Sequence, residues 1–596
     1  MKSLKYIALL MGFGAFALTS CNDFLDQLPD ERTQIDNEEK VRQLLVTSYP
    51  TANYGWICEL SSDNIMDNNT LHLPISSSSE QIAARYNLGS YGRQDDEMYR
   101  FEPCVSSDNQ DTPNYLWSSM YESIISANYA LDGIQKIYEE TGELSETMRQ
   151  SRAEALLIRA YCHFILVNVF SQAYKDEEAS KLDLGVPYVD NVDSVTDFQH
   201  HYDRGSVAGV YEKIEKDLLE GLKDVSDAGY SAVKYHFNLE AAHAFAARFY
   251  LFKREYAKVI EHANAVLTTD PSQMASKLMK FDNFANCTYM DDYVQIFEDP
   301  QSPNNLFLLN TMSLVRRHGL GYRYANNSTR TREIYYHTTP WNGRYYAYPV
   351  IWQAGYTFWT GRDYGYFPAK CGEEFEYTDK LAGIGYVHTI RREFTCNMLL
   401  LERAEAEAML GQYQACAADL IAYNHSLISF SEAEAQAAAA VGVRDLTQED
   451  IDTYFATPAT KESERYAKAN VFANWDFTQN MSPKFVVPQE AVKYMNAINE
   501  FRRFERIFEG DRFFDLKRWG IEYSHVFGNY NHAFEGEGSD QDEITYTMKW
   551  NDPRRALEVP QDAIQAGLTP SRPLIYEPGG DDAVVSYPSE GYFTKE

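Results

Sequence analysis

Residues 499–520 read Asn-Glu-Phe-Arg-Arg-Phe-Glu-Arg-Ile-Phe-Glu-Gly-Asp-Arg-Phe-Phe-Asp-Leu-Lys-Arg-Trp-Gly. Four apolar residues recur at helical spacing and predict one apolar helix face: Phe501, Phe504, Ile507 and Phe508. Arginines and acidic residues fill the positions between them, and Arg502 and Glu505 lie one turn apart. Carboxylates with no neighbouring histidine, cysteine or metal-ligand set are a weak signal for acid–base catalysis. We therefore predict a structural helix whose Arg–Glu pairs lock it beneath the rest of the chain.

The second half of this stretch, Glu-Gly-Asp-Arg-Phe-Phe-Asp-Leu-Lys-Arg-Trp-Gly, resembles the C-terminal hallmark of the SusD/RagB-like family of nutrient-binding surface lipoproteins. The resemblance runs from about Cys21 to the C-terminus. It implies a mainly α fold, with tetratricopeptide-like helical hairpins as scaffold and a large, irregular, loop-rich ligand face. It also implies a binding protein rather than an enzyme, which captures oligosaccharides and delivers them to a partner TonB-dependent, SusC-like outer-membrane transporter.

The composition is that of a globular protein, with 44% hydrophobic and 24% charged residues over 596 positions. A net charge of −33 repels phosphate backbones, so we expect no nucleic-acid partner. Apart from Cys21, the seven other cysteines are dispersed without a Cys-x-x-Cys pair. This spacing suggests no metal framework and leaves at least one free thiol.

Residues 1–20 have the pattern of a lipoprotein signal peptide. Lys2 and Lys5 form a positive start, and the apolar run 7–18 is too short to span a membrane durably. The Leu-Thr-Ser that precedes Cys21 resembles a bacterial lipobox. We therefore predict that Cys21 is lipidated, as a palmitate-bearing first residue of the mature chain, and anchors the protein to a membrane.

The polar residues 21–40 are predicted to be a tether between the lipid and a single body at 41–596. Asp23 and Asp26, soon after the lipidated cysteine, resemble the surface-export signal of the family's hosts. The resemblance implies a lipid-anchored protein of the cell outer membrane that faces outside.

Helical hairpins are predicted near 115–170, 206–267 and 397–423. In the last two, small alanines fill a first helix and a tyrosine, Tyr256 or Tyr413, opens a second. This is the tetratricopeptide pattern, in which alanines let two helices approach closely. Loop-rich insertions at 66–113 and 270–392 interrupt the hairpins, and no helical or strand period organises the aromatic-rich middle of the second.

The two insertions carry the residue types that bind sugars. Aromatic planes pack against the C–H face of a sugar ring, while Asn, Asp and Arg bond its hydroxyls. Aromatics make up about a third of residues 322–367. The candidate ligand-binding residues are Trp341, Trp352, Trp359, Tyr345, Tyr86, Tyr91 and Asn69.

No Gly-x-Ser-x-Gly, His-Glu-x-x-His or phosphate-loop motif appears, so we predict no catalytic residue, metal site or cofactor. His163 lies near an apolar helix face, which favours a core or rim histidine, and the pair His200-His201 has no third ligand nearby. Two alternatives stay open. A peptide-capturing protein would need edge-strand or backbone-bonding surfaces. A glycosidase would need only two carboxylates among the 87 acids.

Overall fold

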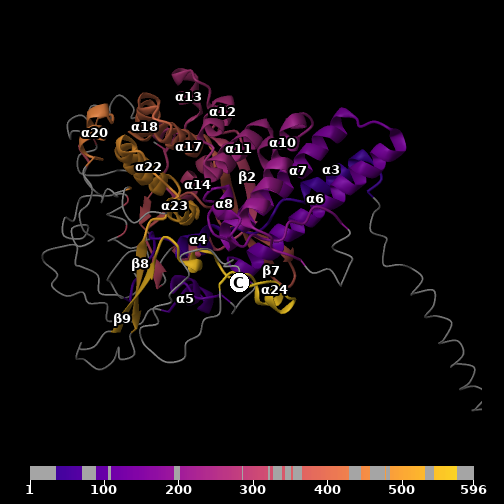
Figure 1. Ribbon diagram of the computed structural model, residues 1–596, viewed down its shortest axis with the longest axis horizontal. Helices are drawn as coiled ribbons and strands as arrows, with labels where there is room; N and C mark the ends of the chain where they lie inside the picture. The colour runs from indigo at the N-terminus through magenta and orange to yellow at the C-terminus, as the bar shows by residue number, and fades with distance from the viewer. Residues whose placement is uncertain are drawn as a thin grey trace, which may run out of the picture.

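The computed structural model describes residues 35–69, 89–104, 109–192, 202–284, 286–319, 323–326, 330, 334, 339–341, 351–353, 366–428, 444–456, 477, 484–529 and 542–572. The predicted signal peptide, Cys21 and His200-His201 lie outside these residues. The described chain is mainly α-helical, which confirms the predicted fold class (Figure 1).

The scaffold is a row of helices in which each packs on the next. It runs from α6 and α7 through α10 to α11 and α12, then to α17, α18 and α22, from right to left in Figure 1. The bounds are α3 Glu38–Val46, α6 Pro113–Thr141, α7 Glu146–Phe170, α10 Val207–Asp224, α11 Leu239–Lys253, α12 Tyr256–Leu267, α17 Cys396–Met409, α18 Tyr413–Ile428 and α22 Val492–Glu505.

Shorter elements connect this row and cover it. The helices are α4 Gly55–Leu60, α5 Arg93–Tyr99, α8 Glu177–Ser180, α13 Pro271–Lys277, α14 Met290–Glu298, α15 Val315–Gly319, α20 Gln448–Thr453, α23 Asp511–Trp519 and α24 Gln561–Gln565. The 3₁₀ turns are η1 Val233–Tyr235, η2 Phe281–Phe284, η3 Gln489–Ala491 and η4 Pro553–Arg555.

Local sequence sets the ends of α6 and α7. The Thr112 side chain accepts a hydrogen bond from the Tyr115 N–H at the start of α6, with proline at the first helical position. Gly142 ends α6 in the left-handed region with φ of 77°, and three residues later the Ser145 side chain caps the start of α7. The prediction that a tyrosine opens the second helix of each of the last two predicted hairpins is confirmed, since α12 begins at Tyr256 and α18 at Tyr413.

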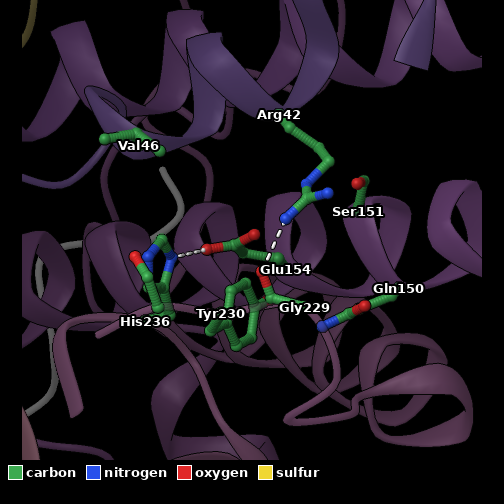
Figure 2. Close-up of a pocket in the computed structure, with 9 residues that line it drawn as sticks. Arg42, Val46, Gln150, Ser151, Glu154, Gly229, Tyr230 and His236 are labelled. Carbon is green, nitrogen blue, oxygen red and sulfur yellow. Dashed lines mark hydrogen bonds and ion pairs between the residues drawn. The ribbon is translucent and has the colours of Figure 1, made fainter. Parts of the chain in front are cut away.

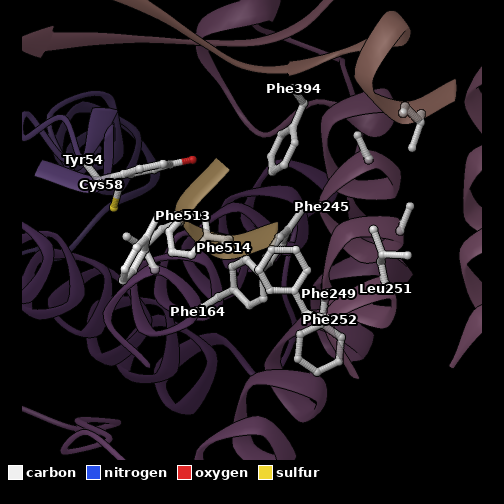
Figure 3. Close-up of a cluster of buried hydrophobic side chains, with 14 of the residues drawn as sticks. Tyr54, Cys58, Phe164, Phe245, Phe249, Leu251, Phe252, Phe394, Phe513 and Phe514 are labelled. Carbon is white, nitrogen blue, oxygen red and sulfur yellow. The ribbon is translucent and has the colours of Figure 1, made fainter. Parts of the chain in front are cut away.

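Aromatic rings from distant segments fill the core between the helical row and the C-terminal helices. In Figure 3, Phe164 of α7 meets Phe252 of α11 at a centroid distance of 5.1 Å, and Phe252 meets Phe514 of α23 at 6.0 Å. Tyr54 lies on the far side of Phe514, at 5.5 Å. Among the described helices, only α7 is long and apolar enough to cross a membrane, and its apolar window is wholly buried in this core.

The insertion at 270–392 is more regular than its sequence suggested. It contributes to an antiparallel sheet with the order β2-β7-β6, formed by Asn305–Met312, Ile384–Thr395 and Glu374–Asp379. Even the aromatic middle, for which the sequence showed no strand period, holds short paired strands at Tyr324–Ala325, Ile351–Gln353 and Tyr366–Pro368. Elsewhere the pairing joins residues some 80 positions apart, such as Leu309 and Arg391, which no local pattern reveals.

Three two-stranded ladders complete the described sheet structure. These are β1 Met66–Asp67 with β3 Tyr324–Ala325, β4 Ile351–Gln353 with β5 Tyr366–Pro368, and β8 Tyr523–Asn529 with β9 Asp542–Met548.

The stretch 499–520 is two helices rather than one, which corrects the prediction. The first, α22, ends at Glu505, and α23 starts at Asp511. Phe508 and Gly510 lie between them with positive φ of 63° and 86°. The helical spacing of apolar residues in the sequence runs on through this break because Phe508, although it lies in the turn, is buried like a residue on the inner face of a helix.

Candidate functional site

The C-terminal helices α22 and α23 form a buried lattice of arginines and carboxylates, as predicted, but with different partners. Arg502 makes two parallel bonds of 2.8 Å to Asp515 rather than pairing with Glu505. Arg512 binds both oxygens of Asp63 at 2.7 and 2.9 Å, and Arg518 binds both oxygens of Glu405. Such two-pronged pairs combine strength with fixed geometry.

The lattice is structural because its arginines are paired with carboxylates and buried away from solvent. Asp515 is 1% exposed. Burial acts to raise its pKa, but the guanidinium groups of Arg502 and Arg518 outweigh burial and hold the pKa below its usual range. A ligand would find no open group here, so the site must lie elsewhere.

Asn69, predicted to bind ligand, lies in a second buried network. It is fully buried, and its N–H donates to Asp67 at 2.8 Å. Asp67 in turn binds Arg323 of the aromatic insertion at 3.0 and 2.8 Å and accepts from the Gly528 N–H of β8. In this structure the Asn69 N–H therefore supports Asp67, which connects β1 to Arg323 and β8, and Asn69 offers no exposed face.

Tyr91 is the predicted site residue that reaches the described surface, with 37% of the residue exposed. Its ring stands edge-on to His318 at 4.4 Å, and His318 stacks on Trp56 at 4.9 Å. Asp95 and Asp111 flank the buried His318, with N–O distances of 3.7 and 3.6 Å. This stack holds the Tyr91 ring in one orientation over the interior.

Polar groups of opposite charge border the exposed Tyr91 ring. Arg317 lies on α15 next to His318, and its Nε donates to Glu373 at 2.7 Å. The bond to Glu373 raises the pKa of Arg317, and the Tyr91 hydroxyl adds to that rise. An exposed aromatic plane beside a guanidinium and a carboxylate has the composition of a sugar subsite.

Trp341 lies in the core. It is fully buried between Tyr454 and Phe455, with centroid distances of 5.2 and 5.6 Å, and its carbonyl accepts from the Arg444 N–H. Trp352 belongs to β4, opposite Phe367 of β5. The candidates Tyr86, Tyr345 and Trp359 lie outside the described residues. Of the seven candidates, Tyr91 is therefore the only one whose side chain is seen on the surface of the described residues.

A separate cavity of about 90 Å³ lies between α3, α7 and the loop before α11 (Figure 2). Glu154 accepts from the Tyr49 hydroxyl at 2.5 Å and contacts the imidazole of His236 at 2.8 Å, while the Tyr230 ring stacks on that imidazole. The volume equals about three water molecules and is far below the roughly 300–1,000 Å³ of sites that enclose small-molecule ligands. It is therefore not the candidate ligand site.

Within the described ranges, no three His, Cys, Asp or Glu side chains converge as a metal site. His163 is a core histidine, as predicted. Its Nδ1 bonds the Arg159 carbonyl, its Nε2 accepts from the Val189 N–H, and burial lowers its pKa to about 3. His243 and His262 share one hydrogen bond of 2.9 Å between their Nδ1 atoms.

Two protein-family models match this chain, one in its N-terminal part and one in its C-terminal part. Residues 23–251 match a SusD-like family model described as starch-binding and associating with the outer membrane, and residues 453–566 match the SusD family model. Together the two models span more than half of the chain. The chain belongs to the SusD/RagB-like family. The second match contains α22, the turn and α23, so the buried lattice is part of the SusD-like body.

Solved structures have the same SusD-like fold. A SusD superfamily protein from Bacteroides thetaiotaomicron is 16% identical, with 90% of this chain and 100% of that chain covered and a TM-score of 0.53. One from Bacteroides vulgatus is also 16% identical, with 90% and 98% covered and a TM-score of 0.50. No curated protein matches the sequence.

Sequence reasoning missed His318, Trp56 and Arg317, which support and border Tyr91. These residues are more than 200 positions apart at the extremes and carry no shared motif. A partial signal existed, because Arg316, Arg317 and His318 form a short basic run directly after the apolar pair Leu314-Val315. Only the fold shows that this run meets the loop that holds Tyr91.

Proposed function

We propose that this SusD-like protein is a cell-surface lipoprotein that captures oligosaccharides and hands them to a TonB-dependent, SusC-like outer-membrane transporter. The observation that carries the proposal is the match to a family model described as starch-binding and outer-membrane-associating. The SusD-like family consists of binding proteins, so the protein acts by binding and release rather than by bond cleavage.

Tyr91 is the described residue best suited to hold a sugar. Its partly exposed ring is fixed by His318, and Arg317 and Glu373 supply a donor and an acceptor beside it. Stacking on a ring that is already held in place costs little conformational entropy. Trp352, Trp359, Tyr345 and Tyr86 remain candidates for further contacts, as predicted from their sequence context.

The test is calorimetric titration of protein that begins at Asn22 against soluble polysaccharides and peptide digests. We expect saturable binding to one class of glycan, weakened at least tenfold by Tyr91→Ala, which is about 1.4 kcal/mol. Tyr138→Ala, which removes an exposed tyrosine from α6, is the matched control and should bind as the wild type does.

Three outcomes would count against this proposal. Binding to peptides alone would favour peptide capture by the same architecture. Cleavage of any glycan by the purified protein would favour a glycosidase. Equal losses in Tyr91→Ala and Tyr138→Ala would move the glycan site away from Tyr91.

A further inference from the structure

The hairpin of β6 and β7 carries a concentrated share of the exposed apolar surface. Phe375 is 46% and Tyr377 52% exposed, and their rings meet at a centroid distance of 4.8 Å. The turn and the facing strand add three more exposed apolar residues: Leu381, Ile384 and Tyr386. Water-soluble proteins rarely keep such clusters exposed unless another molecule covers them.

The outer edge of β6 is open as well. The sheet order is β2-β7-β6, so β6 pairs on one side only, and all six of its residues are exposed. The opposite edge, on β2, is covered, because Met312 N–H donates to Thr51 and the Leu306 carbonyl accepts from Asn238. Among the described residues, no backbone group outside β7 forms a hydrogen bond with the backbone of β6. Such an edge is a template for strand addition.

The charges of β6 select the kind of strand that can join it. Glu374, Glu376 and Asp379 give this six-residue strand three carboxylates. A second copy of β6 would pair poorly, because antiparallel addition about the strand centre places Glu374 opposite Asp379. Like charges directly opposite are destabilising, and opposite charges favour pairing. Lysine or arginine at alternate positions of an incoming strand would meet Glu374 and Glu376, which share one face, with apolar residues against Phe375 and Tyr377 on the other.

We propose that the outer edge of β6 is a docking site for an extended, cationic segment of the partner protein, which joins the sheet as a fourth strand. The inference rests on the proposed function only for the existence of that partner. Backbone bonds along β6 provide affinity, while alternating charged and apolar contacts provide register. The docking site would hold the partner independently of the sugar at Tyr91.

The test uses a labelled ten-residue peptide of alternating lysine and valine, and fluorescence anisotropy with protein that begins at Asn22. We expect saturable binding, weakened at least tenfold by the double variant Glu374→Lys/Glu376→Lys and by Phe375→Ser/Tyr377→Ser. The charge-reversed variant should instead prefer a peptide of alternating glutamate and valine. Glu140→Lys/Glu143→Lys, which changes the net charge equally at the end of α6, should bind as the wild type does.

A lysine–valine peptide methylated at alternate backbone nitrogens separates strand addition from simple charge attraction. It keeps every side chain and loses donors on one edge, so its binding should fall at least tenfold. Equal binding of the methylated peptide, equal loss in the α6 control, or no binding at all would each overturn the proposal. Glycan titration of the hairpin variants should match the wild type. A protein that binds peptide but no glycan would therefore refute the proposed function alone.

Discussion

The α22–α23 pair and the β6–β7 hairpin are built from the same residue types and use them in opposite ways. Both alternate aromatic residues with charged ones. In α23 every residue is buried, and the arginines meet carboxylates from positions as distant as Asp63. In β6 every residue is exposed. The comparison teaches that charged-aromatic sequence stabilises the fold where distant partners cover it and offers a binding surface where none does.

The largest contrast is expected from breaking one ion pair in each region. Asp63→Ala removes both bonds to Arg512 and leaves a buried guanidinium short of its counter-charge, which should cost about 3–5 kcal/mol of unfolding free energy. Glu376→Ala breaks the exposed contact with His388 and should cost less than about 1 kcal/mol. Urea unfolding of both variants measures the difference, and similar costs would contradict the comparison.

One glycine in each region, Gly510 between the helices and Gly383 in the hairpin, allows the cost of backbone strain to be distinguished from the cost of steric crowding. Gly510 and Gly383 both have positive φ, of 86° and 68°, so alanine at either adds about 1–2 kcal/mol of strain. At Gly510 the new Cβ would also lie 3.0 Å from the Cys58 Cβ and 3.1 Å from the Gly55 Cα, whereas nothing lies within 4 Å at Gly383. Gly510→Ala should therefore cost about 1–3 kcal/mol more than Gly383→Ala in thermal or urea unfolding.

Glu59 tests the lattice through pH. Burial raises its pKa to about 7, despite bonds from the Phe508 N–H and the Asn64 amide. Its folded pKa lies above its unfolded value, so the stability it contributes is present below pH 4.5 and is lost as pH rises through 7. Glu59→Gln should remove this pH-dependent loss of stability, which is about 1.4 kcal/mol for each unit by which the folded pKa exceeds the unfolded pKa. Unfolding measured from pH 4 to 8 should show the variant gaining stability relative to the wild type between about pH 4.5 and 7 and then levelling off. A constant difference would refute the assignment.

The smallest effect is expected from the hairpin aromatics. Phe375→Ser should change the free energy of unfolding by no more than about 0.5 kcal/mol, because the side chain is nearly half exposed. Phe514→Ala, which empties a position 4% exposed between Tyr54 and Phe252, should cost about 3–5 kcal/mol. A large loss in Phe375→Ser would mean that the hairpin stabilises the body and is not free for docking.

The sequence predicted the features that depend on neighbouring residues. The ends of α6 and α7 were not predicted to the residue, but their signals are local too, since Thr112, Gly142 and Ser145 act within a few positions of themselves. The tyrosines that open α12 and α18 were found for the same reason.

Features that depend on distant partners were not predictable. The break between α22 and α23 is fixed where the Phe508 N–H bonds Glu59, 449 positions earlier. Trp341 was a candidate for ligand binding because its surroundings in the sequence are polar and aromatic. Its burial depends on Tyr454 and Phe455, which lie more than 110 positions later. Tyr91 could be named from its loop, but the His318 that orients it could not.

The separation between Asp63 and its arginines also sets the order in which the chain can fold. Glu59, Asp63 and Asp67 are made early, but Arg323 follows Asp67 by 256 positions and Arg512 follows Asp63 by 449. Until those cations are synthesised, burial of the early acids would leave carboxylates unpaired in a low-dielectric interior. The segment 53–69 is therefore expected to stay open until the arginines later in the chain are available to pair with it. A chain shortened before Arg512 would leave this early segment without its closing partner, however complete the helical row α6–α12 already is.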